Sequence, residues 1–443
     1  MNEWILSAPA LVKILAALCV LLLVNRWTRS LIAAALAGSL TLGLWCGHGW
    51  SAQGASPGLP VIAQAYLLAT DTWTLGLSVL LAVWLSTLME DSGAMADLVG
   101  VVRGRCRRRT AMAVLPAVIG WLPMPGGANF SAPLVDACDE QRRVEPLTKA
   151  VVNYWFRHIW EYWWPLYPGV LLATKLSHLE APLFMAIMAP FSLVAVITGW
   201  AFLLRRVPAD DHDRPSSRAT LSRDLRDFVT LMLPILVVVA TYTVLRLSLP
   251  AWTTGQARYL PIILGITLAI VVVGIQRRIS WPSWHKALLS GKTFQQVLLT
   301  FLLCGFGAVI ETPSPDGRLL AEVLRGELAA WSIPPELIMA IIPFLIGLVT
   351  GICVAFVAAA FPIVLGLVGS EAGAREIMAA TVLAYGSGYA GLLLSPVHFC
   401  LIQTNLHFKT TLGASLVRLG PACGVLMLAV IAWWAVLRWF PLG

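Results

Sequence analysis

Three ionisable side chains stand inside an otherwise apolar and aromatic stretch, Phe156-Arg-His-Ile-Trp-Glu-Tyr162. An arginine at membrane depth costs about 2.5–3.5 kcal/mol on insertion scales, so ionisable residues in such a place predict a functional site. We expect Arg157 and His158 to face an anion, with Glu161 as their counter-ion or as the carrier of a coupling proton. Because Arg157 and Glu161 are four residues apart, the alternative is that they only neutralise each other on one helical face.

A second interrupted stretch, Tyr385-Gly-Ser-Gly-Tyr-Ala-Gly-Leu-Leu-Leu-Ser-Pro-Val-His398, carries neutral polar groups and a histidine. Its glycines weaken a helix and its proline breaks one, so side chains and carbonyls become available to a ligand. We expect substrate contacts from Ser387 and Ser395, and contacts with a coupling ion from Gly388 and His398. The alternative for His398 is a hydrogen bond to a neighbouring polar side chain and nothing more.

A first helical hairpin is predicted around the turn Leu122-Pro-Met-Pro-Gly-Gly-Ala-Asn-Phe-Ser-Ala-Pro133. The prolines stop one helical arm, and Gly126 and Gly127 let the backbone approach a substrate closely. Asn129 and Ser131 bring polar groups to the start of the return arm, where backbone N–H groups lack helical partners. We expect these four residues to contact substrate, and Asn129 to contact the coupling ion as well. The alternative for Asn129 and Ser131 is simple N-capping.

A second hairpin is predicted around Thr350-Gly351-Ile-Cys353, a less polar turn. Thr350 is a candidate substrate contact, and Gly351 is a candidate contact for the coupling ion. Half-helix N-termini present positive dipole ends to an anion, and unwound carbonyls suit a cation such as Na⁺. We therefore predict Na⁺ at the hairpin tips and helix breaks, and we expect no other metal and no cofactor.

The elements that carry these residues must lie in a membrane. Of the 443 residues, 58% are apolar and 12% are charged, and the mean hydropathy is +0.79, whereas soluble domains carry about 25% charged residues. This composition excludes a disordered chain, a collagen, a coiled coil and a basic nucleic-acid-binding domain. The net charge of +8 comes from arginines in loops between apolar runs, as the positive-inside rule requires. The eight cysteines have no paired spacing and are expected to be buried hydrophobes rather than disulfides or metal ligands.

Ten apolar runs are predicted to cross the bilayer, since about 20 residues span its ~30 Å core. The arms of the first hairpin, about a dozen residues each, are too short to cross, and both hairpins are predicted to be re-entrant. With the N- and C-termini in the periplasm, most basic loops face the cytoplasm and the acidic loop 311–336 faces outward. The predicted spans are residues 5–24, 30–47, 62–90, 149–174, 181–204, 226–247, 259–275, 293–311, 377–402 and 415–439.

The two halves of the chain resemble each other. Met112-Ala-Val-Leu-Pro-Ala-Val-Ile-Gly120 aligns with Met339-Ala-Ile-Ile-Pro-Phe-Leu-Ile-Gly347, each time at the opening of a hairpin. Since each half has five crossings, the second half is inverted, and inverted repeats with discontinuous helices are typical of secondary transporters. The predicted parts are a first repeat (1–205, hairpin 111–138, broken helix 149–174), a cytoplasmic linker (206–225) and a second repeat (226–443, hairpin 337–368, broken helix 377–402).

At these motifs the chain resembles an uncharacterised bacterial membrane family, the domain-of-unknown-function 401 family, over nearly its whole length. The residues that carry the resemblance are Leu122–Pro133, Phe156–Tyr162 and Leu394–His398. That family is grouped in the ion-transporter superfamily with dicarboxylate–sodium symporters, citrate carriers and the large membrane subunits of TRAP systems. The resemblance implies an elevator mechanism, in which hairpins and broken helices slide against a scaffold, and often a homodimer. The Ser-Asn-Thr signature of the dicarboxylate–sodium carriers is absent from both tips, so their substrate and sodium stoichiometry do not carry over.

The sequence therefore predicts an all-α polytopic membrane protein with ten transmembrane helices plus two re-entrant helical hairpins in two inverted-topology repeats. The expected function is secondary active transport of a small, carboxylate-like organic anion with Na⁺ or H⁺ across the bacterial inner membrane. No enzyme activity, ATP site or nucleic-acid partner is expected, and the chain carries no Walker motif. The alternatives are a membrane subunit that works with a separate solute-binding protein, as in TRAP systems, an intramembrane enzyme and a channel.

Overall fold

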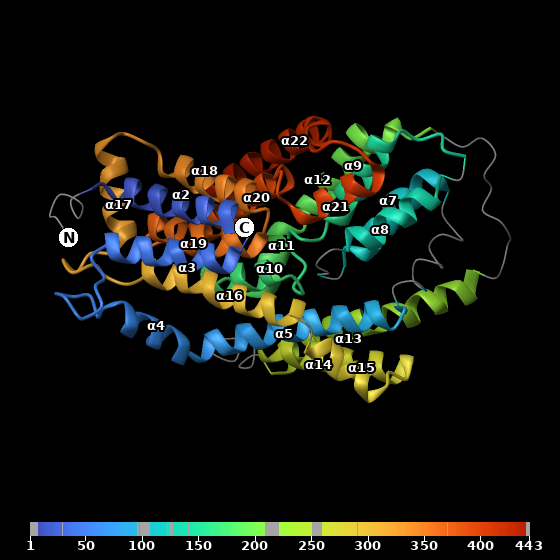
Figure 1. Ribbon diagram of the computed structural model, residues 1–443, viewed down its shortest axis with the longest axis horizontal. Coiled ribbons are helices and arrows are strands. Elements are labelled where there is room, and N and C mark those ends of the chain that lie inside the picture. Colours follow the sequence, from blue (N-terminus) through green and yellow to red (C-terminus); the bar gives the residue numbers. More distant parts are fainter. Residues whose placement is uncertain are drawn as a thin grey trace.

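The computed structural model describes residues 8–28, 30–94, 97, 107–121, 123, 127–139, 141–208, 221–249, 259–289, 291–369 and 371–439. Within these ranges the protein is α-helical, and the only β-type pairing is an isolated bridge between Gln53 and Ser56. Figure 1 shows an elongated bundle in which many of the helices run roughly along the long axis. The all-α class predicted from the sequence is confirmed.

The first half forms helices because lipid offers no partner for backbone N–H and C=O groups, which must bond within their own segment. Local signals set the ends: the Ser30 side chain accepts a hydrogen bond from the Ala33 N–H at 3.2 Å, and Pro146 and Pro168 stand at helix starts, where their missing N–H is not needed. The helices are α2 Ala10–Thr28, α3 Leu31–Trp45, α4 Leu59–Leu68, α5 Thr70–Asp91, α7 Arg108–Ile119, α8 Ala128–Ala137, α9 Pro146–Arg157, α10 Pro168–Ser177, α11 Ala181–Met188 and α12 Pro190–Thr198.

A π-helical turn, Gly199–Leu203, and a short 3₁₀ turn, Leu204–Arg206, extend α12. The second half follows the same physical rules, and α18 ends at Gly351, whose φ of 63° is the left-handed conformation typical of a helix C-terminus. Its helices are α13 Leu221–Ser248, α14 Leu260–Arg277, α15 Trp281–Leu288, α16 Gly291–Ile310, α17 Leu320–Ala330, α18 Pro335–Thr350, α19 Cys353–Val368, α20 Ala374–Leu393, α21 Phe399–Phe408 and α22 Leu412–Trp439.

The protein is a multi-pass membrane protein. In the described part of the chain, six helical segments are long and apolar enough to cross a bilayer. Leu193 on α12 and Leu428 on α22 are about two-thirds exposed, which suits side chains that face lipid. The six segments are Ala10–Thr28, Thr72–Asp91, Ala181–Arg206, Leu260–Arg277, Trp281–Ile310 and Leu412–Trp439, and each overlaps a predicted span.

Most of the remaining predicted spans are formed by shorter or interrupted helices. The run 30–47 becomes the 15-residue helix α3, and the run 226–247 lies within α13. The run 62–90, which the segment Thr72–Asp91 overlaps, is divided at Ala69, whose backbone is extended. The predicted spans 149–174 and 377–402 are each two helices, α9 with α10 and α20 with α21. The predicted hairpins 111–138 and 337–368 appear as the adjacent helix pairs α7 with α8 and α18 with α19 (Figure 1).

The core lies where these paired helices meet. Helix α18 packs along α20, α19 packs against α10, and α21 packs against both α8 and α9. Close backbone approach depends on glycine: a Cβ on Gly120 would lie 1.9 Å from the carbonyl oxygen of Arg157, and a Cβ on Gly347 would lie 2.1 Å from that of Gly388. The pairs of short helices therefore pack tightly against the interrupted ones.

Candidate functional site

Two helix interruptions meet at the centre of the candidate site. Helix α9 ends at Arg157 and α10 begins at Pro168, so residues 158–167 form turns rather than helix. Helix α20 ends at Leu393 and α21 begins at Phe399. Since Pro396 disfavours the helical conformation of the residue before it, the second interruption falls at Ser395 and its neighbours.

Two histidines, one from each interruption, contact each other. His158 Nε2 lies 3.2 Å from His398 Nε2, and His158 Nδ1 lies 2.6 Å from the carbonyl oxygen of Tyr154. A carbonyl only accepts, so the neutral His158 ring carries its proton on Nδ1 and accepts at Nε2 from the N–H of His398. Glu161 Oε1 is 3.8 Å from His158 Nε2. The predicted residues His158, Glu161 and His398 thus form one buried cluster.

Arg157 sits beside this cluster and is 3% exposed. The alternative in which Arg157 and Glu161 share one helical face does not hold as stated, because α9 ends at Arg157 and Glu161 lies in the turns beyond it. The two opposite charges are nevertheless close enough to interact. The guanidinium instead packs against the first hairpin: a Cβ added to Gly127 would lie 2.4 Å from Arg157 Nη1. The absence of a side chain at Gly127 is what makes room for the arginine.

The second hairpin reaches the same place. Gly351 has a positive φ, and a Cβ there would lie 2.8 Å from His398 Cα and 2.9 Å from Ser395 Oγ. Gly169 at the start of α10 lies against the same hairpin turn, since a Cβ on it would lie 2.3 Å from Cys353 Sγ. Both hairpins and both interruptions therefore converge on one region.

Three tyrosine hydroxyls donate to backbone carbonyls at helix ends: two in the first interruption and one at the end of α7. Tyr389 donates to the His158 carbonyl at 2.8 Å, Tyr385 donates to the Glu161 carbonyl at 2.7 Å, and Tyr167 donates to the Gly120 carbonyl at 2.5 Å. Unbonded carbonyls cost several kcal/mol each in a membrane. The three hydroxyls lower the free-energy cost of the irregular backbone and fix its conformation. The sequence analysis did not select these tyrosines as site residues.

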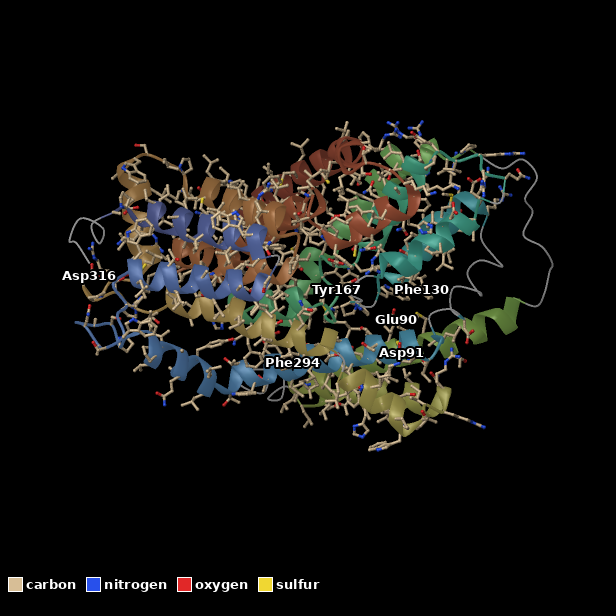
Figure 2. The ribbon with its side chains drawn as sticks, in the orientation of Figure 1. Glu90, Asp91, Phe130, Tyr167, Phe294 and Asp316 are labelled. Atoms are coloured by element: carbon tan, nitrogen blue, oxygen red, sulfur yellow. The ribbon has the colours of Figure 1, made fainter. Side chains whose placement is uncertain are left out.

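A cavity of about 1750 Å³ opens beside the cluster, and Figure 2 places Tyr167, one of its lining residues, near the middle of the molecule. Its polar lining includes Arg157, His158, Glu161 and His398. The walls also include residues of α2 and α16, so the space lies between the converging elements and a second group of helices.

The other predicted residues have more varied positions. Gly126 lies outside the described residues, as does the side chain of Asn129, whose backbone begins α8. Thr350 lines the cavity, but its hydroxyl donates to the Ile346 carbonyl. Ser395 Oγ accepts from the Val397 N–H at 3.3 Å.

Three of the remaining predicted residues also lie within helices. Gly388 is in α20, where a Cβ would lie 2.4 Å from the Phe356 ring, so the interruption begins only after Leu393. Ser387, also in α20, and Ser131 in α8 have buried hydroxyls with no hydrogen-bond partner among the described residues.

Cys400 was missed by sequence reasoning, which treated the cysteines as buried hydrophobes. One ring nitrogen of His158, one of His398 and Cys400 Sγ all lie within 4.8 Å of one another. The spacing His398-Phe-Cys400 was the one sign in the sequence that these two side chains could lie close together. It gave no indication that His158, far away in sequence, would be the third member of the group.

A buried ion cluster fixes the base of the first hairpin to α9. Lys149 Nζ lies 2.8 Å from Asp139 Oδ2, and Arg108 Nη1 lies 3.6 Å from Asp139 Oδ1. The backbone N–H groups of Arg143 and Val144 also donate to this carboxylate, each at 2.9 Å. Burial raises the pKa of Asp139, but the hydrogen bonds from Lys149 and the two N–H groups outweigh it and hold the pKa below its ordinary value. The hairpin base therefore stays ion-paired at neutral pH.

The fold and the site define an α-helical multi-pass membrane protein with interrupted helices that meet at a buried polar cluster. The chain belongs to a family described as "Protein of unknown function (DUF401)", whose model matches residues 61–437. This confirms the family resemblance predicted from the sequence.

The fold is similar to the crystal structure of the Alcanivorax borkumensis YdaH transporter, whose report describes an unusual topology. The TM-score is 0.62 at 15% identity, and the match covers 93% of this chain and 98% of that one. No curated protein matches the sequence.

Proposed function

We propose that this protein is a secondary active transporter that moves a small, carboxylate-like organic anion, coupled to Na⁺ or H⁺. The observation that carries the proposal is the meeting of two helix interruptions and two hairpins around the buried Arg157, beside a cavity of about 1750 Å³. The fold shared with a protein described as a transporter supports the same class of function.

The chemistry of the cavity favours an anion. Arg157 brings a permanent positive charge to a place where water is scarce, and guanidinium groups bind carboxylates through paired hydrogen bonds. The two histidines and Glu161 can exchange hydrogen bonds with an anion and with each other. Pockets for small ligands usually measure about 300–1000 Å³, so the cavity is large enough for an organic anion together with its coupling ion.

An inverted repeat and an elevator motion are part of the proposal. The helix pairs α7–α8 and α18–α19 stand at corresponding places in the two halves, and so do the interrupted helices that follow them. The aligned residues Gly120 and Gly347 both approach a carbonyl of the interrupted helix of their own half. This correspondence supports ten crossings with two re-entrant hairpins. The proposal also includes an inner-membrane location with periplasmic termini, as the charge pattern of the loops predicts, and a homodimer, as the superfamily resemblance implies.

The proposal is tested with the variant Arg157→Gln, in detergent and in reconstituted vesicles. Purified protein is first screened for thermal stabilisation by carboxylates and phosphates with and without Na⁺, and the best ligand is then used in uptake assays under a Na⁺ or a pH gradient. We expect Arg157→Gln to abolish both the ligand-induced stabilisation and the uptake, because the variant keeps hydrogen-bonding capacity but loses the charge.

Arg318→Gln is the matched control, since this arginine is exposed and pairs with Asp316, two residues away in sequence. It is expected to behave as wild type. Unchanged ligand stabilisation in Arg157→Gln would remove the anion assignment. Ion conductance without saturable uptake would identify a channel instead, and uptake that requires an added soluble protein would identify a TRAP-like subunit.

An intramembrane hydrolase is the weakest alternative. A serine nucleophile needs a base within hydrogen-bond reach, and Ser387 Oγ has no hydrogen-bond partner among the residues that the structure describes. Hydrolysis in detergent that is lost in Ser387→Ala would restore this alternative.

A further inference from the structure

We infer that His158, His398 and Cys400 form a binding site for a zinc-class transition-metal dication. The inference concerns a ligand that the transport proposal does not include, and it stands whether or not the protein carries an anion. It starts from three metal-ligating groups that are all buried and whose ligand atoms lie within 4.8 Å of one another.

The geometry of the histidine pair fits a metal. In a tetrahedral site with Zn–N bonds of about 2.05 Å, two nitrogen ligands are about 3.3 Å apart. The observed distance between His158 Nε2 and His398 Nε2 is 3.2 Å. A dication between these atoms would need only small side-chain adjustments.

His158 is already oriented as a metal ligand. Its Nδ1 donates to the Tyr154 carbonyl at 2.6 Å, which leaves Nε2 unprotonated. This Nε2 and that of His398 can both coordinate once the His398 ring carries its proton on Nδ1 instead of Nε2, and His398 Nδ1 has no hydrogen-bond partner among the described residues. Histidines that bind metals almost always donate their other ring N–H to a carbonyl or carboxylate in this way. Glu161 Oε1, 3.8 Å from His158 Nε2, stands close enough to supply a fourth ligand, and a water from the cavity is the alternative.

The ligand set selects the class of metal. Imidazole and thiolate favour zinc and its neighbours in the first transition series, whereas Na⁺, Mg²⁺ and Ca²⁺ prefer oxygen ligands. The site therefore differs in kind from the Na⁺ sites expected at the hairpin tips. Because His158 comes from the first interruption, His398 from the second and Cys400 from the first turn of α21, a bound dication would link the two interruptions directly.

Cobalt gives the first test, since Co²⁺ reports tetrahedral coordination by its visible bands and thiolate ligation by a near-ultraviolet charge-transfer band. Purified full-length protein is treated with chelator, desalted and titrated with Co²⁺, and Zn²⁺ is then added. We expect both sets of bands with one equivalent of Co²⁺, and their loss when Zn²⁺ displaces it. In Cys400→Ser the thiolate band should disappear, and in His398→Gln the affinity should fall at least tenfold.

Cys423→Ser is the matched control, because Cys423 is a buried cysteine on α22 outside the three-residue group. It should keep the full spectrum. A thiolate band that survives in Cys400→Ser, or octahedral bands only in folded wild type, would overturn the inference.

A second test needs no variant and so does not depend on folding of a mutant. One equivalent of Zn²⁺ should slow the alkylation of Cys400 by a small maleimide at least tenfold, as followed by peptide mass spectrometry, and chelator should reverse the protection. The exposed Cys19 should react at the same rate throughout. Equal rates for Cys400 with and without Zn²⁺ would contradict the inference.

Discussion

Gly127 and Arg157 fit each other at the level of single atoms. The guanidinium occupies the space that a side chain on Gly127 would fill, with Nη1 2.4 Å and Cζ 2.6 Å from the position of such a Cβ. Gly127 has an ordinary helical backbone, with φ of −57°, so glycine is needed here for space and not for conformational freedom. The hairpin thereby determines where the positive charge can lie in the cavity.

Gly127→Ala is therefore expected to weaken anion binding while the protein still folds. The added methyl group meets the flexible end of an arginine, which can move aside, but the guanidinium then loses its place at the ligand. A hydrogen bond to a charged group contributes about 1.5–3 kcal/mol, so affinity should fall roughly 10- to 100-fold. The measurement is ligand titration by thermal shift or calorimetry on purified protein.

Gly326→Ala on α17 serves as the comparison, since a Cβ there meets nothing within 4 Å. It should bind ligand as wild type does. If Gly127→Ala bound the ligand equally well, the contact with Arg157 would have no part in recognition.

At the residue scale, the sequence predicted the site where a charge stood in an apolar run. Arg157, His158, Glu161 and His398 come together because each would be too costly at membrane depth without polar surroundings. Cys400 carries no such signal, because a cysteine is as common in an apolar core as an aliphatic residue. The supporting tyrosine hydroxyls were missed for the same reason, since only the fold shows which carbonyls they reach.

Some helices pack closely because glycines stand where they meet. Gly120 and Gly347 stand against carbonyl oxygens, of Arg157 and of Gly388, which belong to backbone and cannot rotate away. Gly120→Ala and Gly347→Ala should each destabilise the protein by about 1–3 kcal/mol through overpacking. Gly424→Ala on α22, where a Cβ meets nothing within 4 Å, should be neutral or slightly stabilising, because alanine is the better helix former.

Melting temperatures in detergent, followed by intrinsic fluorescence, measure these differences. If Gly120→Ala and Gly347→Ala both melted at the wild-type temperature, the helices would not approach each other as closely as described.

The sequence predicted the elements well where proline and glycine interrupt an apolar run, and less well where they do not. A break within residues 149–174 and a break around Pro396 were expected, and both are present, although the first begins directly after Arg157, earlier than the prolines predict. The glycines at 386 and 388 were expected to loosen the chain, yet they remain helical because large neighbours such as Phe356 fill the space beside them. A glycine required for packing and one required for a break look identical in a single sequence.

Two connections of opposite charge lie toward opposite ends of the molecule's long axis. The segment that contains Asp316 lies at one end (Figure 2), and the connection between α8 and α9, which contains Arg143, lies toward the other (Figure 1). The proposed topology requires such a separation, since it places the acidic loop outside and the basic loops in the cytoplasm.

Cysteine labelling tests this orientation. A membrane-impermeant maleimide should react with Asp316→Cys in cells whose outer membrane is permeabilised, and with Arg143→Cys only after the inner membrane is opened. Both side chains are exposed, so accessibility to the reagent depends on sidedness alone. Labelling of both positions from the same side would exclude the proposed topology and the inverted repeat with it.

The hydroxyls of Tyr385 and Tyr389, one turn apart on α20, donate hydrogen bonds to carbonyls of the turns that follow α9. In the other direction, the Asn153 side chain on α9 donates to the Thr404 hydroxyl on α21. The second half thus fixes the irregular turns of the first half, and α9 of the first half in turn bonds to α21 of the second. A fragment of residues 1–208 or of residues 221–443, expressed alone, should therefore lack the binding pocket. The same two fragments expressed together should assemble and form it.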